Sequence, residues 1–244
     1  MKTNSKGNVE VSVIMPARNV ERYVQEAVES VLRQQGVSFE LLLVDDASTD
    51  ETWRKIQPYR SDPRVRLWRS RRRQGAAGAR NLLLRFARGR YVVPCDADDK
   101  ILPGYLKSLV TAIRKHPSAG VVFFSWFLEQ RGKRIITSRK VLGPDRAWDL
   151  LGYESIGHPG TLIRRSMMEQ VRGYDVKLPF LHDYDLFLRL AEVTRFLCLK
   201  GKPLFFHRRR RGTISDCTSR DYKRVFQTVL RKAILRRYHI RVPW

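Results

Sequence analysis

The sequence has few cysteines, few acidic residues and no long apolar run. Its three cysteines, Cys95, Cys198 and Cys217, are scattered and form no CxxC pair, which argues against a disulfide framework or a zinc site and is typical of a reducing compartment. No apolar run approaches the roughly 18 residues that a membrane-spanning helix needs, and the amino terminus is polar rather than signal-like. We therefore expect a soluble or peripheral protein in the cytoplasm.

The shortage of acidic residues leaves a large positive charge. Lysine and arginine number 48 against 24 acids, which gives a formal net charge of +24. Such an excess favours a polyanionic partner, either nucleic acid, an acidic membrane surface or a phosphate-rich substrate. With 244 residues and 43% hydrophobic content, the chain is long enough for one sizeable core.

Three of the 24 acidic residues gather after one apolar run. Tyr91 to Cys95 reads as a buried strand, and Asp96, Asp98 and Asp99 follow it directly. Ligands bind at the carboxyl ends of strands in open α/β sheets. Three neighbouring carboxylates repel one another unless a cation lies between them, and Mg²⁺ or Mn²⁺ prefers such oxygen ligands. The alternative is that Asp98 or Asp99 caps a helix predicted over 103–116.

A second acidic strand end lies earlier in the chain. The pattern predicts a strand at Val11–Met15, a helix from an N-cap at Asn19 to Gln34, and a strand at Phe39–Val44. This is a βαβ unit, so the two strands should be parallel. Asp46 ends the second strand, where it would either accept hydrogen bonds from a base or ribose or simply form a turn.

Two later helices carry polar groups at their amino ends. The small residues around Gly75 to Asn81 suit a helix packed closely on the sheet, with a phosphate-binding amino terminus. Asp183 begins another helix, and both a capping and a catalytic role are open for it. Further strands are predicted over 120–128, with a hairpin partner at 134–137, and a short helix over 144–151.

The last segment is a predicted helix from Arg220 to Ile240. An apolar stripe is bordered by basic residues, which suits packing on the chain's own domain or binding at a membrane surface. We predict a domain over residues 1–218 followed by a basic amphipathic helix within 219–244.

Four motifs in this order resemble the inverting family 2 glycosyltransferases of GT-A fold. They are Val11-Ser12-Val13-Ile14-Met15-Pro16-Ala17-Arg18-Asn19, Leu43-Val44-Asp45-Asp46-Ala47-Ser48-Thr49-Asp50, Gly78-Ala79-Arg80-Asn81 and Asp96-Ala97-Asp98-Asp99. His182-Asp183-Tyr184-Asp185 is similar to the (E/H)D-x-D segment of that family. The resemblance covers roughly residues 9–215 and implies a Rossmann-like mixed α/β sheet flanked by helices.

The resemblance also implies a role for each motif residue. Pro16, Arg18 and Asp46 would line the pocket of the nucleotide base, with Arg80 beside the nucleotide. Asp96 would contact ribose or sugar, and Asp98 would hold a Mn²⁺ or Mg²⁺ ion on the diphosphate. Asp183 would be the general base that deprotonates the acceptor hydroxyl. Many members of the family have an aromatic residue at the position of Arg18.

The implied activity is transfer of one sugar from a nucleotide-sugar donor, with a UDP-sugar favoured, to a glycan or lipid-linked acceptor in cell-surface polysaccharide or glycolipid synthesis. The Gln-x-x-Arg-Trp motif of processive synthases is absent, which favours single transfers. A basic protein of this kind would suit the anionic inner face of the membrane. The rival interpretations are a nucleic-acid-binding module, which carboxylates at strand ends would oppose, and an inactive scaffold.

Overall fold

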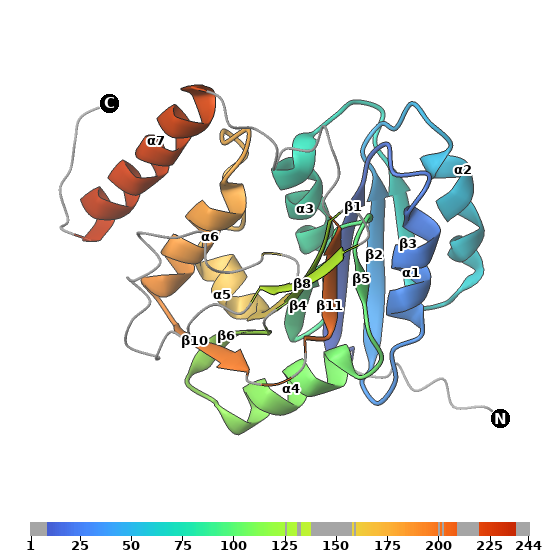
Figure 1. Cartoon of the computed structure of the whole chain (residues 1–244), viewed down its shortest axis with the longest axis horizontal. Coiled ribbons are helices and arrows are strands. Elements are labelled where there is room, and N and C mark those ends of the chain that lie inside the picture. Colours follow the sequence, from blue (N-terminus) through green and yellow to red (C-terminus); the bar gives the residue numbers. More distant parts are fainter. Residues whose placement is uncertain are drawn as a thin grey trace.

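The fold, seen in a computed structural model, is a mixed sheet covered by helices on both faces (Figure 1). The structure describes residues 9–124, 126–130, 133–137, 158, 160–199, 201, 203–208 and 220–237, so the helix predicted over 144–151 lies outside the described residues. Seven strands form the main sheet in the order β10-β6-β9-β4-β1-β2-β3. The predicted GT-A type α/β fold is therefore confirmed in its architecture.

The first half of the chain builds the parallel part of this sheet. β1 (Val11–Ala17), β2 (Phe39–Asp45), β3 (Val65–Arg69) and β4 (Tyr91–Pro94) pair in parallel. α1 (Val24–Leu32) connects β1 to β2, which confirms the predicted βαβ unit. α2 (Thr52–Ile56) and the 3-10 turn η1 (Gln57–Ser61) precede β3, and α3 (Gly75–Phe86) precedes β4.

The second half completes the sheet with mixed strand directions. α4 (Tyr105–Lys115) leads into β6 (Ala119–Phe124), and β9 (Thr161–Arg164) runs antiparallel between β4 and β6. α5 (Arg165–Gln170) and α6 (His182–Ala191) follow, and β10 (Arg195–Leu199) pairs in parallel with β6.

The sequence suggests one strand over the apolar run 120–128, but the structure does not form one there. The run divides between β6 in the main sheet and β7 (Trp126–Gln130) in a small second sheet. That second sheet has the order β5-β11-β7-β8, with β5 (Lys100–Ile101), β8 (Lys133–Thr137) and β11 (Phe205–Arg208). The predicted hairpin is present, because β7 and β8 pair antiparallel.

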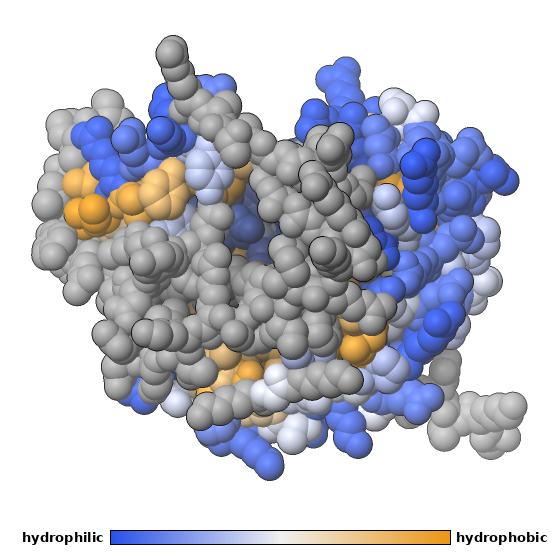
Figure 2. Space-filling view, viewed as in Figure 1, coloured by the Kyte–Doolittle hydropathy of each residue, from blue (hydrophilic) through white to orange (hydrophobic). Residues whose placement is uncertain are grey.

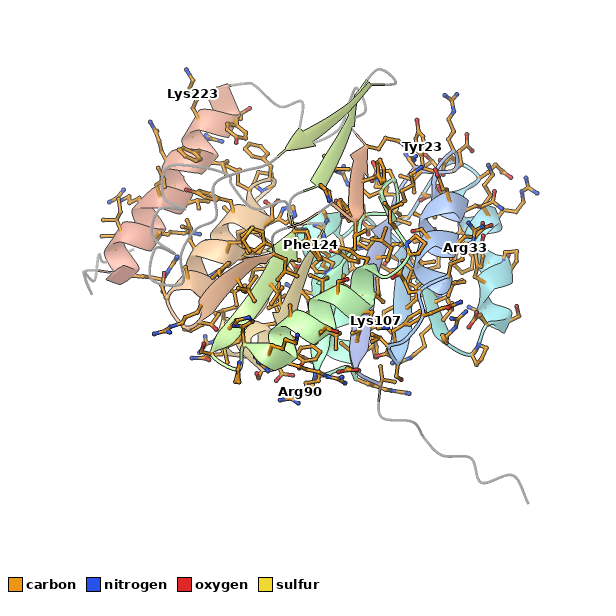
Figure 3. All side chains as sticks on the ribbon, turned by 60° about the horizontal axis from the view of Figure 1, so that its bottom comes forward. Tyr23, Arg33, Arg90, Lys107, Phe124 and Lys223 are labelled. Atoms are coloured by element: carbon orange, nitrogen blue, oxygen red, sulfur yellow. The ribbon has the colours of Figure 1, made fainter. Side chains whose placement is uncertain are left out.

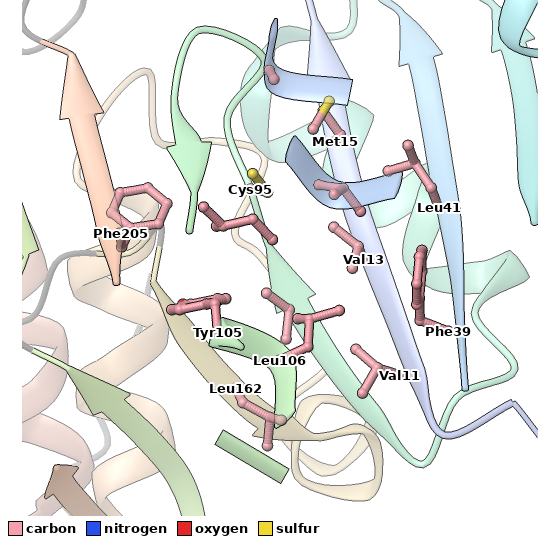
Figure 4. Packing of buried hydrophobic residues seen from close by; sticks show 14 of the residues in the cluster. Val11, Val13, Met15, Phe39, Leu41, Cys95, Tyr105, Leu106, Leu162 and Phe205 are labelled. Carbon is pink, nitrogen blue, oxygen red and sulfur yellow. The ribbon is translucent and has the colours of Figure 1, made fainter. Parts of the chain in front are cut away.

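Each face of the main sheet has its own apolar core. Buried side chains of α1, α2 and α4 pack on one face, and those of α3, α5 and α6 pack on the other. Figure 4 shows the first core, where Leu106 from α4 lies near Val11 and Val13 on β1, and Tyr105 from the same helix lies near Phe205. The two layers hold the sheet rigid, so its edge can position side chains accurately.

The last helix, α7 (Arg220–Arg237), packs on α6. Val225, Val229 and Ala233 are buried, and the rings of Tyr184 and Phe226 stack with centroids 5.6 Å apart. Of the two roles open for the apolar stripe, packing on the domain is therefore the one that the structure shows.

The sheet opens at its carboxyl edge, at two prolines. The carbonyl of Ile14 accepts a hydrogen bond from the N–H of Cys95, so the backbone polar groups of Ile14 point toward β4. The backbone of Pro16, two residues further along β1, faces the same neighbour. The β1–β4 ladder has ended by then, at Ile14 and Pro94, so the missing N–H of Pro16 costs no strand pairing. Pro94 faces the other way, beyond the two residue pairs of the β4–β9 ladder. The strands separate here, where a ligand site is expected.

Candidate active site

Asp46 lies buried at the end of β2 and holds the amino terminus of α3. Its two carboxylate oxygens accept hydrogen bonds from the backbone N–H groups of Gln74 (2.7 Å) and Gly75 (3.0 Å). Only 3% of Asp46 is exposed. The turn-like role that the sequence left open is thus present, and each oxygen keeps a lone pair that a base could still use.

Arg18 ties the end of β1 to the loop after β2. One of its guanidinium nitrogens donates to the carbonyl oxygens of Asp46 (2.8 Å) and Ala47 (2.9 Å). Pro16 and Arg18 are both half-buried, so the structure brings three of the four residues predicted at the nucleotide to one strand edge.

The sequence predicts Asn19 as the N-cap of the first helix, but in the structure Asn19 does not cap that helix. It has a left-handed backbone with φ of 48°, its N–H donates to Ser48, and its side chain accepts from Thr49 at 2.9 Å. α1 begins five residues later, after a turn closed by the Val20 carbonyl. Asn19 therefore joins the two loops at the nucleotide end of the site.

Arg80 forms an ion pair with Asp96 at the end of β4. Arg80 is buried, and its other terminal nitrogen lies 2.8 Å from Nε2 of His182. Burial alone would lower the pKa of Arg80, but the charges of Asp96, Tyr174 and Asp183 outweigh it and raise that pKa. Arg80 is therefore a permanent cation between β4 and α6.

Asp99, next in the acidic loop, is held by β11. Its carboxylate lies 3.1 Å from Nδ1 of His207 and accepts the N–H of Arg208 at 2.8 Å. Burial alone would lower the pKa of His207, but the bond to Asp99 and its charge raise that pKa to about 9. The Arg208 side chain donates to the Asp98 carbonyl and pairs with Glu26. The basic segment at 207–208 thus fixes the acidic loop.

Asp183 lies in the first turn of α6, where it is half-buried. Its side chain accepts the N–H of Tyr184 at 2.9 Å, but Leu181 is the N-cap of α6 and no side chain caps the helix, so the capping role open for Asp183 is not the one that the structure shows. Its neighbour His182 contacts Arg80, and Arg80 contacts Asp96. These contacts connect the first turn of α6, which carries the predicted base, to Asp96 at the end of β4.

The carboxylates of the acidic loop suit a divalent cation that is bound partly by substrate phosphates. Among the described residues, no group of three or more histidine, cysteine or acidic side chains surrounds a metal position. Asp96 pairs with Arg80 and Asp99 with His207, and the half-buried Asp98 lies between these two residues in the chain. Mg²⁺ and Mn²⁺ sites often use one or two carboxylates plus phosphate and water, so Asp98 fits the role that the resemblance gives it.

Within the described part of the chain, four non-glycine residues have left-handed backbones, and all four adjoin this site or its supports. They are Asn19, Ala47, Arg172 and Leu181, which follow Arg18 and Asp46 and precede Gly173 and His182. Such conformations cost about 1 kcal/mol or more each and persist where surrounding contacts impose them. Strain of this kind is common at functional sites.

Sequence reasoning gave no role to several residues that build the site. His182, Tyr174, Asn81 and His207 are the main ones, and their contacts join positions 93 to 108 residues apart in the chain. The signals available were weak. His182 adjoined the predicted base, and His207 headed a basic run that no spacing rule connects to the acidic loop.

Solved structures with the same fold define the class of protein. The Staphylococcus aureus TarS fragment 1–349, crystallised with UDP-GlcNAc, superposes with a TM-score of 0.79 at 22% identity, over 93% of this chain and 67% of that one. This match confirms a GT-A type glycosyltransferase fold.

The sequence matches then give the family. The model of glycosyl transferase family 2 matches residues 12–172. An Escherichia coli UDP-Glc:alpha-D-GlcNAc-diphosphoundecaprenol beta-1,3-glucosyltransferase, WfgD, is 30% identical over 74% of this chain and 68% of its own length. An Escherichia coli chondroitin synthase is 29% identical over 76% of this chain, which spans only 27% of that protein. The chain belongs to the family 2 glycosyltransferases.

Proposed function

We propose that this protein is a metal-dependent inverting glycosyltransferase that moves one sugar from a UDP-sugar to a hydroxyl group. The observation that carries the proposal is the position of Arg80, whose guanidinium pairs with Asp96 and contacts the histidine preceding Asp183. A carboxylate on the donor side and the helix turn that carries the candidate base are thus joined through the guanidinium of Arg80. An in-line displacement requires such groups, from separate elements, at one site.

The residues divide the work by position. Pro16, Arg18 and Asp46 would hold the base at the ends of β1 and β2. Asp96 would contact the ribose or sugar. Bound at Asp98, Mn²⁺ or Mg²⁺ would neutralise charge on the leaving diphosphate.

Asp183 would act on the acceptor hydroxyl. Its carboxylate would take the proton of the acceptor hydroxyl as that oxygen bonds to the anomeric carbon. The bond from that carbon to the diphosphate breaks in the same displacement, and attack on the face opposite the leaving group inverts the configuration.

Two relatives suggest the substrates. The name of WfgD specifies a UDP-glucose donor and a diphosphoundecaprenol-linked acceptor, and TarS was crystallised with UDP-GlcNAc. We extend to this chain the UDP-sugar donor that both proteins suggest and the lipid-linked acceptor that the name of WfgD gives, in cell-surface polysaccharide synthesis.

A lipid-linked acceptor would require contact with a membrane surface, and α7 carries basic side chains suited to that contact. Among the helices that the structure describes, none has a segment apolar and long enough to cross a bilayer. The outward side of α7 carries exposed Lys223, Arg224 and Arg231, and Lys223 points away from the body of the molecule (Figure 3). Each such charge adds about 1 kcal/mol of attraction to an anionic leaflet, which supports peripheral binding at the inner membrane face.

Calorimetric titration tests the donor assignment. UDP, GDP and dTDP are titrated at fixed salt with and without Mn²⁺. Tight binding of UDP alone, only with Mn²⁺, is expected. Tight UDP binding that is unchanged without metal would remove the metal role, and binding of none of the three would favour a scaffold.

Vesicle co-sedimentation tests the membrane contact separately. Replacement of Lys223, Arg224 and Arg231 by glutamate should release the protein from vesicles containing anionic phosphatidylglycerol, since it reverses three charges. The same protein should keep its UDP affinity. Unchanged vesicle binding would reject this role for α7.

A further inference from the structure

The side chain of Arg80 touches both the acidic loop after β4 and the first turn of α6. One terminal nitrogen pairs with Asp96, and the other lies 2.8 Å from Nε2 of His182. Arg80 is 5% exposed and His182 is 7% exposed. At this burial the two contacts are shielded from water and fix geometry more firmly than surface pairs do.

This contact determines where the proton of His182 lies. Arginine has only donors, so Nε2 of His182 must accept and the imidazole is neutral with its proton on Nδ1. Burial, and then the charge of Arg80, lowers the pKa of His182, against the opposing charges of Asp183, Asp96 and Asp185. The other ionisable groups near this ring are Tyr174, whose ring meets it edge-on, and the buried His158.

The neighbouring helix residue, Asn81, fixes the segment that backs Arg80. Its side chain donates to the carbonyl of Tyr174 (2.8 Å) and accepts the N–H of the same residue (2.9 Å). The Arg80 guanidinium carbon lies 5.8 Å from the centre of the Tyr174 ring, and the Tyr174 hydroxyl lies 2.8 Å from Nε2 of His158. Arg80 is therefore held from behind as well as at both ends.

Two nitrogens in this cluster have no hydrogen-bond partner among the described residues. They are Nε of Arg80 and Nδ1 of His182, and both are fully buried. A buried donor without a partner is costly, and in native proteins it commonly marks a functional site. Packing alone would favour an apolar residue at position 182, so the histidine has a role that uses its nitrogen.

We propose that Arg80 and His182 form a positioning pair that sets the distance between the donor end of the site and the base. Arg80 holds Asp96 through one nitrogen and, through His182, holds the first turn of α6, on which Asp183 lies. The pair requires His182 to stay neutral, because a protonated ring would face the guanidinium with a second positive charge. This inference rests on the proposed roles of Asp96 and Asp183.

Nuclear magnetic resonance tests the pair without any activity. In long-range ¹H–¹⁵N spectra, the five histidines of the chain are assigned with single glutamine variants. His182 should show a protonated Nδ1 and a bare Nε2 at pH 8, and its ring should stay neutral to a lower pH than an ordinary histidine does, because burial and Arg80 lower its pKa. A proton on Nε2 of His182, or a charged ring at pH 8, would overturn the proposal.

Kinetic variants then separate positioning from packing. His182→Leu keeps the volume but removes the acceptor, so kcat for UDP release from UDP-glucose or UDP-GlcNAc should fall about 10- to 100-fold. Affinity for UDP with Mn²⁺ should change less than twofold. His182→Gln restores an acceptor for Arg80 and should recover most of the lost rate.

Two outcomes would reject the pair, namely equal rates in His182→Leu and the wild type, or a loss that glutamine does not recover. A protein that binds and transfers no UDP-sugar would instead reject the proposed function. The histidine spectra would still report on the pair in that case, so the two failures are distinguishable.

Discussion

Gly173 lies directly against the side chain of Asn81. A Cβ atom at Gly173 would come within 2.6 Å of the Asn81 amide oxygen, and the backbone of Gly173 is left-handed, with φ of 67°. Asn81 uses that same oxygen to hold the N–H of Tyr174. A glycine is therefore required here both for its conformation and for its missing side chain.

Replacing this glycine should disturb the support of Arg80. Gly173→Ala must strain the backbone and displace Asn81, so we expect the free energy of unfolding to fall by about 2–4 kcal/mol. Gly104→Ala is the matched control, because Gly104 has φ of 82° but no atom within 4 Å of its Cβ position. That variant should lose only about 1–2 kcal/mol.

Urea unfolding of both variants measures the difference. An equal loss in the two proteins would show that the contact with Asn81 adds nothing to the backbone term. The Gly173 variant should also weaken the Arg80 contacts, which the histidine spectra described above would report as a changed His182 signal.

The parallel core of the fold could be predicted from the sequence, but the small sheet could not. Strand and helix periods alternate clearly up to Pro94, so β1, α1, β2 and β4 follow from pattern alone. Within the apolar run after α4 the only turn-favouring residue past Gly120 is Ser125, a weak signal, and the split of the run between two sheets depends on partners distant in the chain.

The site was predictable as motifs and not as contacts. Asp46, Asp96 and Asp98 follow strands, so their place at one edge follows from parallel pairing. The left-handed backbones of Ala47 and Leu181 are imposed by packing, because neither residue type favours that conformation. The contact of Arg80 with His182 joins residues 102 positions apart, and no local pattern encodes it.

Metal binding should depend on Asp98. Asp98→Ala removes the carboxylate proposed to hold the cation, so Mn²⁺ should no longer strengthen UDP binding, and the affinity with Mn²⁺ should fall by more than about tenfold. Asp62→Asn, a change at a surface ion pair with Arg64, is the control. A full Mn²⁺ effect in the Asp98 variant would show that other groups bind the metal.

Stability should decrease in mild acid because His158 is buried as a neutral ring. Burial, followed by the charge of Arg80, holds its pKa well below the ordinary value. The unfolded chain binds a proton near pH 6.5 that the folded chain refuses, so stability is fully present above that pH and is lost as the pH falls below it.

Replacing His158 should remove part of that loss. Each such group contributes a slope of up to about 1.4 kcal/mol per pH unit. His158→Gln can keep the bond to Tyr174 without titrating, so its unfolding free energy should change less steeply between pH 6.5 and 4.5. Identical slopes in His158→Gln and the wild type would contradict the assignment.

Removing part of the α7 interface should destabilise the whole domain. Val229 is fully buried between α7 and α6, so Val229→Ala should cost about 2 kcal/mol. Thr228→Ala, on the exposed side of the same helix, should cost less than about 0.5 kcal/mol. One cooperative transition with a lower midpoint is expected, and an unchanged midpoint would show that α7 folds independently.

The apolar edge of α7 limits how the helix can meet a membrane. Figure 2 shows an orange band along α7 below the blue residues at its upper end. Phe226 and Leu230 pack against the α6 core, while Ile234 is 44% exposed. With most of the stripe occupied, membrane contact would depend on charge, and binding to anionic vesicles should fall steeply as salt is raised.

The base assignment has the sharpest single test. Asp183→Asn keeps the size of the side chain and an oxygen that can accept the N–H of Tyr184, so α6 should remain intact. UDP binding with Mn²⁺ should stay within about twofold, because Asp183 is placed on the acceptor side. The amide cannot take a proton from the acceptor, so transfer should fall by about 10²- to 10⁴-fold, the range typical of a general base.

Asp185→Asn serves as a structural comparison, since Asp185 is buried and paired with Arg189, and it should lower the unfolding midpoint more than the Asp183 variant does. If Asp183→Asn transfers sugar at the wild-type rate, another group must accept the proton. If it loses UDP binding and transfer together, Asp183 contributes to the donor site.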